Sequence, residues 1–238
     1  MATKYGAYAG KVLKIDLTAK TWEEYPLYDK DREMFVGGKI LAARIIYDFI
    51  KSPIDPISPE NVLVVTSCPL NGTGCPSSSR FNVSAISPLT GILTSSNCGG
   101  NFGLSLKRAG YDAVIFTGKS ESLTWVEITD TDVRFNDASH LKGMLTGETQ
   151  QAIGGKSGKL VIGPAGESMV RYACAVSNDR AAGRGGVGAV MGSKNLKAIT
   201  AYGVFQQPVY NPEKLAKLKK KWVKRLKAHP LTGRQLPK

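Results

Sequence analysis

Two glycine-rich runs in this sequence carry the residue types that bind anions. The longer run, Asn178–Gly188, holds four glycines together with Arg180 and Arg184. Glycines let backbone N–H groups approach a ligand closely, and an arginine guanidinium grips a phosphate with two parallel hydrogen bonds. No Gly-Lys-Ser/Thr triplet closes the run, so it is not a Walker A loop. The run predicts a phosphate-binding loop, and the alternative is an exposed loop with hydrated arginines.

The second run, Asn97–Gly103, opens a predicted helix. The free N–H groups and the dipole at a helix N-terminus favour an anion. The alternative is an ordinary glycine-rich start to a helix, because the G-x-G-x-x-G pattern of a dinucleotide-binding βαβ unit is missing. Arg80 is a third candidate. It stands between a loop rich in Ser, Gly and Pro and a predicted strand, and its alternative is an exposed arginine at a strand end.

Residues that could ligate a metal are sparse. No C-x-x-C occurs, and no histidine stands at metal-ligand spacing from a cysteine, so we expect neither a zinc site nor an iron–sulfur cluster from this chain alone. His140 is expected in a turn, since no partner can be identified that would orient it as a general base. The cysteines are Cys68, Cys75, Cys98 and Cys174, and the histidines are His140 and His229.

Composition and length narrow the class of protein. With 42% hydrophobic residues in 238, the chain can bury a substantial core. No apolar run reaches the roughly 18 residues of a transmembrane helix, and the first residues lack the apolar segment of a signal peptide. We therefore expect no membrane span, and a cytoplasmic protein with reduced thiols.

Most of the net charge of +13 lies near the C-terminal end. Residues 213–238 carry ten Lys or Arg and one acid, so they contribute +9. Asn211 and Pro212 predict the N-cap and first residue of a basic amphipathic helix. Trp222 alone interleaves the lysines, so nucleic-acid binding is not expected, although a basic scaffold remains an alternative. The narrow apolar stripe of this helix consists of Leu215, Leu218, Trp222 and Leu226.

The hydrophobic pattern predicts an α+β fold with mostly antiparallel sheets and few helices. The run 163–167 is expected to turn, with Glu167 in solvent, and the Pro-Leu-x-Gly pattern at 69–72 and 88–91 predicts two tight turns. Further helices are expected over residues 40–50, 102–109 and 146–153. Strands are expected over residues 11–17, 21–25, 61–67, 80–87, 112–117, 123–129, 133–136, 159–162, 169–176 and 198–202.

Ten short motifs occur in this sequence in a fixed order, and the ordered set is a more specific indicator of family than any single motif. Together they closely resemble the N-terminal domain of the aldehyde ferredoxin oxidoreductase family, whose members are tungsten (or related molybdenum) bis-pterin enzymes. The resemblance runs from about residue 8 to residue 203. It implies a bis-pterin-binding domain over 1–205, followed by a linker and the start of the next helical region over 206–238. The motifs are Val36–Gly38, Asp55–Asn61, Pro69–Thr73, Ser87–Gly91, Ser96–Gly100, Ala109–Asp112, Asp137–His140, Ile162–Glu167, Arg180–Gly186 and Gly188–Ala198.

The resemblance implies a base of two similar β-sheets, on which two pterins lie about a pseudo-two-fold axis. Arg80 matches the arginine that lies between a pterin and the iron–sulfur cluster. Asn97 and Gly99 match the first pterin-binding segment. The match also places Cys75 and Cys98 in loops that face the pterins, although neither corresponds to a cluster ligand.

The second pterin-binding segment is matched by Arg180, Ala181 and Gly183. By the same resemblance, the backbone carbonyls of Asn97 and Ala181 would hold a Mg²⁺ ion that bridges the two pterin phosphates. Close backbone approach at such a ligand requires glycine, so we expect positive φ angles over the run 183–186.

The implied activity is oxidation of an aldehyde to a carboxylic acid with ferredoxin as the electron acceptor. The family's [4Fe–4S] cluster is held by four downstream cysteines, three of them in a C-x-x-C-x-x-x-C stretch that this chain lacks. A larger cysteine-bearing subunit, or the remainder of a longer protein, would complete the enzyme, and ferredoxin or another electron-transfer subunit would accept electrons. The alternatives are a subunit of a benzoyl-CoA reductase-type complex and a non-catalytic cofactor carrier or basic scaffold.

Overall fold

Residues 3–234 are the part of the chain that this computed structural model describes, and they form two six-stranded β-sheets. The first sheet has the order β2-β1-β6-β3-β4-β5, with β1 Val12–Asp16, β2 Thr21–Tyr25, β3 Leu63–Ser67, β4 Phe81–Ile86, β5 Leu93–Cys98 and β6 Ala113–Thr117. The second has the order β11-β10-β9-β12-β7-β8, with β7 Thr124–Ile128, β8 Val133–Asp137, β9 Gly158–Val161, β10 Ala175–Ser177, β11 Arg180–Ala182 and β12 Leu196–Ala201.

The two sheets share one topology. Each begins with an antiparallel hairpin, β1–β2 or β7–β8, and each returns a last strand, β6 or β12, parallel to the first strand of that hairpin. The three strands between them pair antiparallel in the same order and end at an edge, β5 in the first sheet and β11 in the second. Residues 12–117 and 124–201 are therefore topological repeats, and the expectation of two similar, mostly antiparallel sheets is confirmed.

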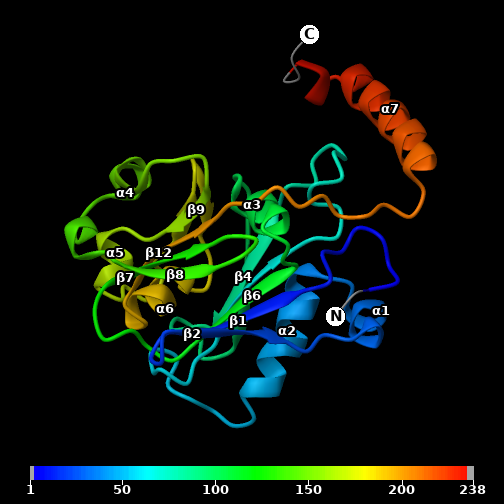
Figure 1. The fold of residues 1–238 in the computed structure, drawn as a ribbon. Helices are drawn as coiled ribbons and strands as arrows, with labels where there is room; N and C mark the ends of the chain where they lie inside the picture. Colours follow the sequence, from blue (N-terminus) through cyan, green and yellow to red (C-terminus); the bar gives the residue numbers. More distant parts are fainter. Residues whose placement is uncertain (1–2, 235–238) are drawn as a thin grey trace.

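The helices of residues 3–234 cover the sheets unevenly (Figure 1). Leu41, Ile45 and Ile46 of α2 pack on Val64 and Ile115 of the first sheet, because apolar residues at helical spacing form one face. The helices are α1 Asp29–Phe35, α2 Gly38–Phe49, α3 Phe102–Arg108, α4 Thr146–Ile153, α5 Pro164–Glu167, α6 Val187–Ser193 and α7 Pro212–Ala228, with short 3₁₀ turns over Ser139–Leu141 and Thr232–Arg234.

A single cluster of fully buried apolar side chains joins the two repeats. It contains Leu13 and Phe81 from the first sheet, Val126 and Leu160 from the second, and Phe102 from α3. Because side chains from both sheets share this cluster, the repeats pack as one unit rather than as two independent domains. The edge strands β5 and β11 are thereby held next to each other.

Several elements differ from the sequence predictions. The strand expected over 169–176 is wrong for most of its length, because only Ala175–Ser177 pair with neighbours and Met169 has a φ of +53°. Glu167 is not in solvent: it forms an ion pair with Lys197, which is fully buried. The periodicity did not indicate α1, α6, β5 or β11. In α6 all seven residues are buried, so its sequence has no polar face that would mark a helix.

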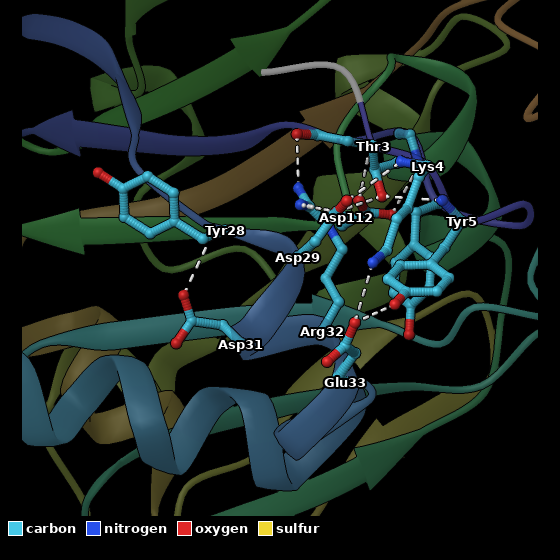
Figure 2. A network of polar contacts seen from close by, with 12 residues as sticks. Thr3, Lys4, Tyr5, Tyr28, Asp29, Asp31, Arg32, Glu33 and Asp112 are labelled. Carbon is cyan, nitrogen blue, oxygen red and sulfur yellow. Dashed lines mark hydrogen bonds and ion pairs between the residues drawn. The ribbon is translucent and has the colours of Figure 1, made fainter.

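Buried charges tie the N-terminal segment to the first repeat. The Asp112 carboxylate forms an ion pair with Lys107 and accepts hydrogen bonds from the backbone N–H groups of Ala9 (3.0 Å) and Gly10 (2.8 Å). Arg32 donates to the carbonyl oxygen of Gly10 at 2.8 Å. Figure 2 shows how Asp112 and the α1 side chains gather around this segment. Each buried charge has a partner, which is the condition for burying it at all.

The C-terminal helix α7 stands away from both sheets (Figure 1). The Asn211 side chain accepts a hydrogen bond from Lys214 N at 2.8 Å, and Pro212 is the first helical residue, so both predictions are confirmed. Lys219 donates to the carbonyl oxygen of Thr73 at 3.1 Å. No residue of α7 is buried, and Trp222 is 50% exposed. Within residues 3–234, no helix is long and apolar enough to cross a bilayer.

Lys194 is a fully buried lysine that joins the repeats. It follows α6, and its Nζ donates to the carbonyl oxygens of Pro59 (3.2 Å) and Gly118 (2.8 Å). Burial lowers the pKa of Lys194 to about 8, although the charges of Glu60 and Asp16 oppose this shift. Carbonyl oxygens replace only part of the hydration that a charged ammonium loses.

We expect the contribution of Lys194 to the free energy of unfolding to rise between pH 8 and pH 10.5, because the native state releases the Lys194 proton while the unfolded chain retains it. Lys194→Met removes this dependence. The free energy of unfolding of the variant should therefore exceed that of wild type by about 3 kcal/mol at pH 7, and this difference should be lost by pH 10.5. Urea denaturation at both pH values measures it, with the exposed Lys142→Met as control. Identical pH profiles for wild type and Lys194→Met would contradict the expectation.

Candidate anion-binding site

The edge strands of the two sheets bring the two glycine-rich runs together. The Cys98 thiol at the end of β5 lies 3.5 Å from the carbonyl oxygen of Arg180 in β11. A Cβ atom on Gly99 would lie 3.2 Å from Cγ of Arg180. Segments separated by about eighty residues in the sequence are thus in van der Waals contact. Five of the six residues matched to the family motifs belong to these edge strands or directly follow them, and the sixth, Arg80, precedes β4, which pairs with β5. The five are Asn97, Gly99, Arg180, Ala181 and Gly183.

Three exposed arginines give this junction its charge. Arg80 donates from Nε to Oδ1 of Asn97 and, at 3.4 Å, from Nη2 to the carbonyl oxygen of Asn97. Within residues 3–234, the guanidinium groups of Arg180 and Arg184 have no hydrogen-bond or ion-pair partner. One acid, Asp179, lies in the same turn. Unpaired guanidinium groups beside glycine backbone are suited to bind a phosphate.

Steric constraints explain the glycines, but not all of them alike. Gly185 has a φ of +70°, and a Cβ there would lie 2.1 Å from Oγ1 of Thr94. Gly186 also has a positive φ, so the expectation for this run holds at both positions. It is wrong for Gly183, which directly follows β11, has no left-handed φ and would place a Cβ in ordinary contact, 3.5 Å from the Cys174 sulfur.

The start of α3 is partly occupied by the protein itself. The backbone N–H of Asn101 donates to Oδ1 of Asn178 at 2.9 Å, and that of Phe102 donates to Oγ of Ser177 at 3.3 Å. The sequence had suggested that the N–H groups of this run are free to bind an anion. These two are not free, because side chains of the protein already accept from them. The groups near this junction that have no partner among the described residues are the guanidinium groups of Arg180 and Arg184.

The surface beside the junction is polar in the first repeat and apolar in the second. Asn97 donates to Oδ1 of Asn82 at 3.4 Å, and Asn82 donates to Oγ of Ser95 at 3.1 Å, which gives β4 and β5 a hydrogen-bonded polar face. Ala181 and Gly183 border a different surface. There, a groove of about 720 Å³ is lined mainly by apolar groups, among them Leu145, Pro164, Val170, Tyr172, Cys174 and Val176.

The Cys98 side chain points into the core beneath the junction, not to the exposed surface. Successive residues of a strand point to opposite faces, so Asn97 is exposed while Cys98 is fully buried in the core. Burial raises the pKa of the Cys98 thiol to about 11, so the thiol is protonated at neutral pH and is a poor metal ligand. Cys75 lies instead in a groove beside Trp222 of α7. Among the described residues, no three His, Cys, Asp or Glu side chains converge as metal ligands.

The residues present fit a cofactor that carries phosphate groups. A side chain at Gly99 would displace Arg180, and Arg180 itself is unpaired, so the junction combines a glycine cradle with free cationic groups. Sequence reasoning included Asn178 and Ser96 in its motifs without assigning them a role, and it missed Gln150 and Ser177; all four hold the two runs in place. The signal that could have pointed to them is the Ser-Asn-Asp turn composition just before Arg180.

Comparison with known proteins identifies the family. The sequence model described as "Aldehyde ferredoxin oxidoreductase, N-terminal domain" matches residues 12–203. The chain belongs to the aldehyde ferredoxin oxidoreductase family. The expectation drawn from the ten motifs is therefore confirmed.

Relatives within the aldehyde ferredoxin oxidoreductase family are close. The chain is 40% identical to the tungsten-containing aldehyde ferredoxin oxidoreductase of Pyrococcus furiosus over 98% of its own length and 40% of that protein. It is 34% identical to the WOR-like subunit of an aliphatic sulfonate oxidoreductase from the same organism, over 92% of the chain and 38% of that subunit. The chain thus spans about two fifths of these relatives.

A solved structure shows the same fold. A chain of the active site complex BamBC of benzoyl coenzyme A reductase, in complex with 1,5 dienoyl-CoA, superposes with a TM-score of 0.91 at 37% identity. The match covers 93% of this chain and 35% of that chain. The two-sheet base is therefore shared between the aldehyde ferredoxin oxidoreductase domain and this reductase component.

Gly185 and Gly183 provide a matched pair of substitutions. We expect Gly185→Ala to lower the free energy of unfolding by at least about 2 kcal/mol, because its Cβ collides with Thr94 at a left-handed φ. Gly183→Ala should change it by less than about 0.5 kcal/mol. Chemical denaturation measures both, and adding Thr94→Ala to Gly185→Ala should recover part of the loss. Equal effects at the two glycines would contradict the steric explanation.

Proposed function

We propose that this chain is the tungstopterin-binding part of an oxidoreductase that oxidises aldehydes to carboxylic acids with ferredoxin as the acceptor. The observation that carries the proposal is the junction of β5 and β11, where two glycine-rich loops from equivalent places in the two repeats are in contact and the guanidinium groups of Arg180 and Arg184 have no partner among the described residues. The 40% identity to a tungsten-containing aldehyde ferredoxin oxidoreductase supports the choice of cofactor and reaction.

In this proposal each repeat holds one pterin. Asn97 and Gly99 bind the first, and Arg180, Ala181 and Gly183 bind the second, with the arginine fork on a phosphate. The backbone carbonyls of Asn97 and Ala181 would hold a Mg²⁺ ion, since hard cations prefer oxygen ligands. Arg80 is oriented by its bonds to Asn97 and would lie toward the iron–sulfur cluster.

The cofactor, tungsten or molybdenum bis-pterin, supplies the two-electron redox chemistry when bound, and this chain positions it. The two loops follow equivalent strands of the two repeats, and the two halves of the ligand are chemically alike. The same local structure can therefore bind each half. The glycines bring backbone N–H groups close to the ligand. Arg180 neutralises phosphate charge and fixes the direction of the half that it binds, and the rigid sheet edges hold the binding groups in place.

The remaining machinery belongs to the part of the relatives that this chain does not span. We assign residues 1–205 to the pterin-binding domain and residues 206–238 to a linker and the start of the next helical region. A larger cysteine-bearing subunit, or the rest of a longer polypeptide, would supply the [4Fe–4S] ligands and the substrate pocket. Ferredoxin or another electron-transfer subunit would take the electrons, in the cytoplasm.

A second candidate is a subunit of a benzoyl-CoA reductase-type complex. The TM-score of 0.91 with the BamBC component favours it, because the match covers 93% of this chain. The features that separate the two reactions lie in the pocket-forming parts outside this chain. An aldehyde-dependent reduction of ferredoxin, compared with reduction of an aromatic CoA thioester, distinguishes them in the purified protein.

Arg180→Ala should weaken retention of the cofactor about 10- to 100-fold, because a charge-assisted bidentate contact contributes roughly 1.5–3 kcal/mol. Tungsten and pterin per chain, measured after anaerobic purification and extensive dialysis, report the loss. Arg134→Ala is the control, since Arg134 is exposed on β8 and pairs with Asp132. Equal tungsten content in the Arg180 variant and wild type would exclude a role for Arg180 in binding.

The cofactor-bearing species from the native host should be larger than 25.5 kDa, the mass of this chain, because redox chemistry at such a cofactor requires a dry, enclosed cavity. Anaerobic size measurement with metal analysis tests this, and we expect one metal to two pterins. A stable 25.5 kDa monomer that carries the metal and is active without any second polypeptide would contradict our proposal that the cluster ligands and the substrate pocket lie outside this chain.

A further inference from the structure

We infer that Gln150 and Asn178, both in the second repeat, are positioning residues for the first cofactor loop, and that the two loops therefore bind the cofactor as one unit. This inference rests on the proposed function. It concerns a chain of hydrogen bonds that runs from α4 through the turn between β10 and β11 to the start of α3. None of these bonds comes from a residue that we place in contact with the cofactor.

Asn178 is held in a conformation that directs its side chain across the junction. It has a φ of +53°, which is uncommon for a residue other than glycine and is tolerated best by asparagine and aspartate. In this conformation its Oδ1 accepts the N–H of Asn101 at 2.9 Å. A residue of the second repeat thus completes the backbone hydrogen bonding of the first.

Gln150 fixes the backbone of Asn178 from α4. Its Oε1 accepts the N–H of Asn178 at 2.8 Å, and its Nε2 donates to the carbonyl oxygen of Asn178 at 3.2 Å. The same Nε2 lies 3.2 Å from the carbonyl oxygen of Thr146, one helical turn earlier. Two bonds to the donor and acceptor of one residue leave that residue little freedom to change its φ and ψ angles.

The contact between the loops is reciprocal. Ser177 accepts the N–H of Phe102 at 3.3 Å, and Gly100 approaches so closely that a Cβ there would lie 2.5 Å from the carbonyl oxygen of Ser177. In the opposite direction, Ser96 of β5 accepts the N–H of Arg184 at 3.0 Å. Each loop is therefore held by the other repeat, and a shift of one loop displaces both.

The hydrogen-bonded residues Asn101 and Asn178 lie close in the sequence to residues that we propose bind the cofactor. Asn101 lies two residues after Gly99, and Asn178 lies two residues before Arg180. A ligand that spans both loops needs a fixed separation between Asn97 and Arg180. Partners that hold binding groups in place typically change ligand retention without touching the ligand, and their loss costs about 10- to 100-fold in metal affinity.

Asn178→Gly removes the side-chain acceptor while permitting the positive φ, and Gln150→Ala removes the two bonds to Asn178. Both positions are only partly buried or exposed, so both variants should fold. Asn178→Asp keeps the acceptor and serves as rescue. Gln151→Ala, at an exposed neighbouring position of α4, is the matched control. The complete cofactor-loaded protein, purified anaerobically, is used throughout.

Two measurements are made on each variant. Hydrogen exchange of the peptide that contains Asn101 and Phe102 should accelerate about tenfold in Asn178→Gly and Gln150→Ala. The half-time of tungsten loss on dialysis should shorten about tenfold in the same two variants. Asn178→Asp should retain wild-type behaviour in both measurements, and so should Gln151→Ala.

Faster exchange with unchanged tungsten retention would show that the hydrogen bonds of Gln150 and Asn178 have a structural role only. It would overturn their assignment as positioning residues. Unchanged exchange would overturn it too, since the bonds would then not restrain the loop. Failure of the proposed function gives a different result: the purified wild type would contain no tungsten or pterin, or Arg180→Ala would retain both, whatever the exchange rates of the Gln150 and Asn178 variants.

Discussion

The approach of the β5 and β11 edges is the constraint on which the candidate site depends. Backbone lies against backbone there, and at Gly100 and Gly185 a methyl group would fall within 2.5 Å of an oxygen atom. Such contact is possible only for glycine and only if the two sheets are held at a fixed spacing. The requirement for glycine at these two positions follows from that spacing.

The spacing is maintained by a shared core and by buried charges. The apolar cluster that contains Phe81, Phe102 and Leu160 belongs to both repeats, so neither sheet can move without opening it. Lys194 links α6 to carbonyl oxygens of Pro59 and Gly118, at the cost of a lowered pKa. A polar tie of this kind is directional, and it fixes orientation where apolar packing alone fixes only proximity.

The two repeats use one topology for two different surfaces. The first presents the hydrogen-bonded polar face around Asn82 and Asn97. The second presents a largely apolar groove beside Cys174. A pseudo-symmetric base with asymmetric surfaces can hold the two halves of one cofactor in equivalent positions while giving each half a distinct environment. In the proposed enzyme, that asymmetry would distinguish the pterin beside Arg80 from its partner.

The sequence by itself determined the family, most of the strands, helices such as 40–50 and 146–153, and the capping of α7 at Asn211. These depend on local periodicity, turn chemistry and motif order, which neighbouring residues encode. Only the tertiary structure decided which residues meet: that Asn178 bonds Asn101, that Cys98 is buried, and that Glu167 pairs with Lys197. Such contacts join residues up to about eighty positions apart, and no local pattern specifies them.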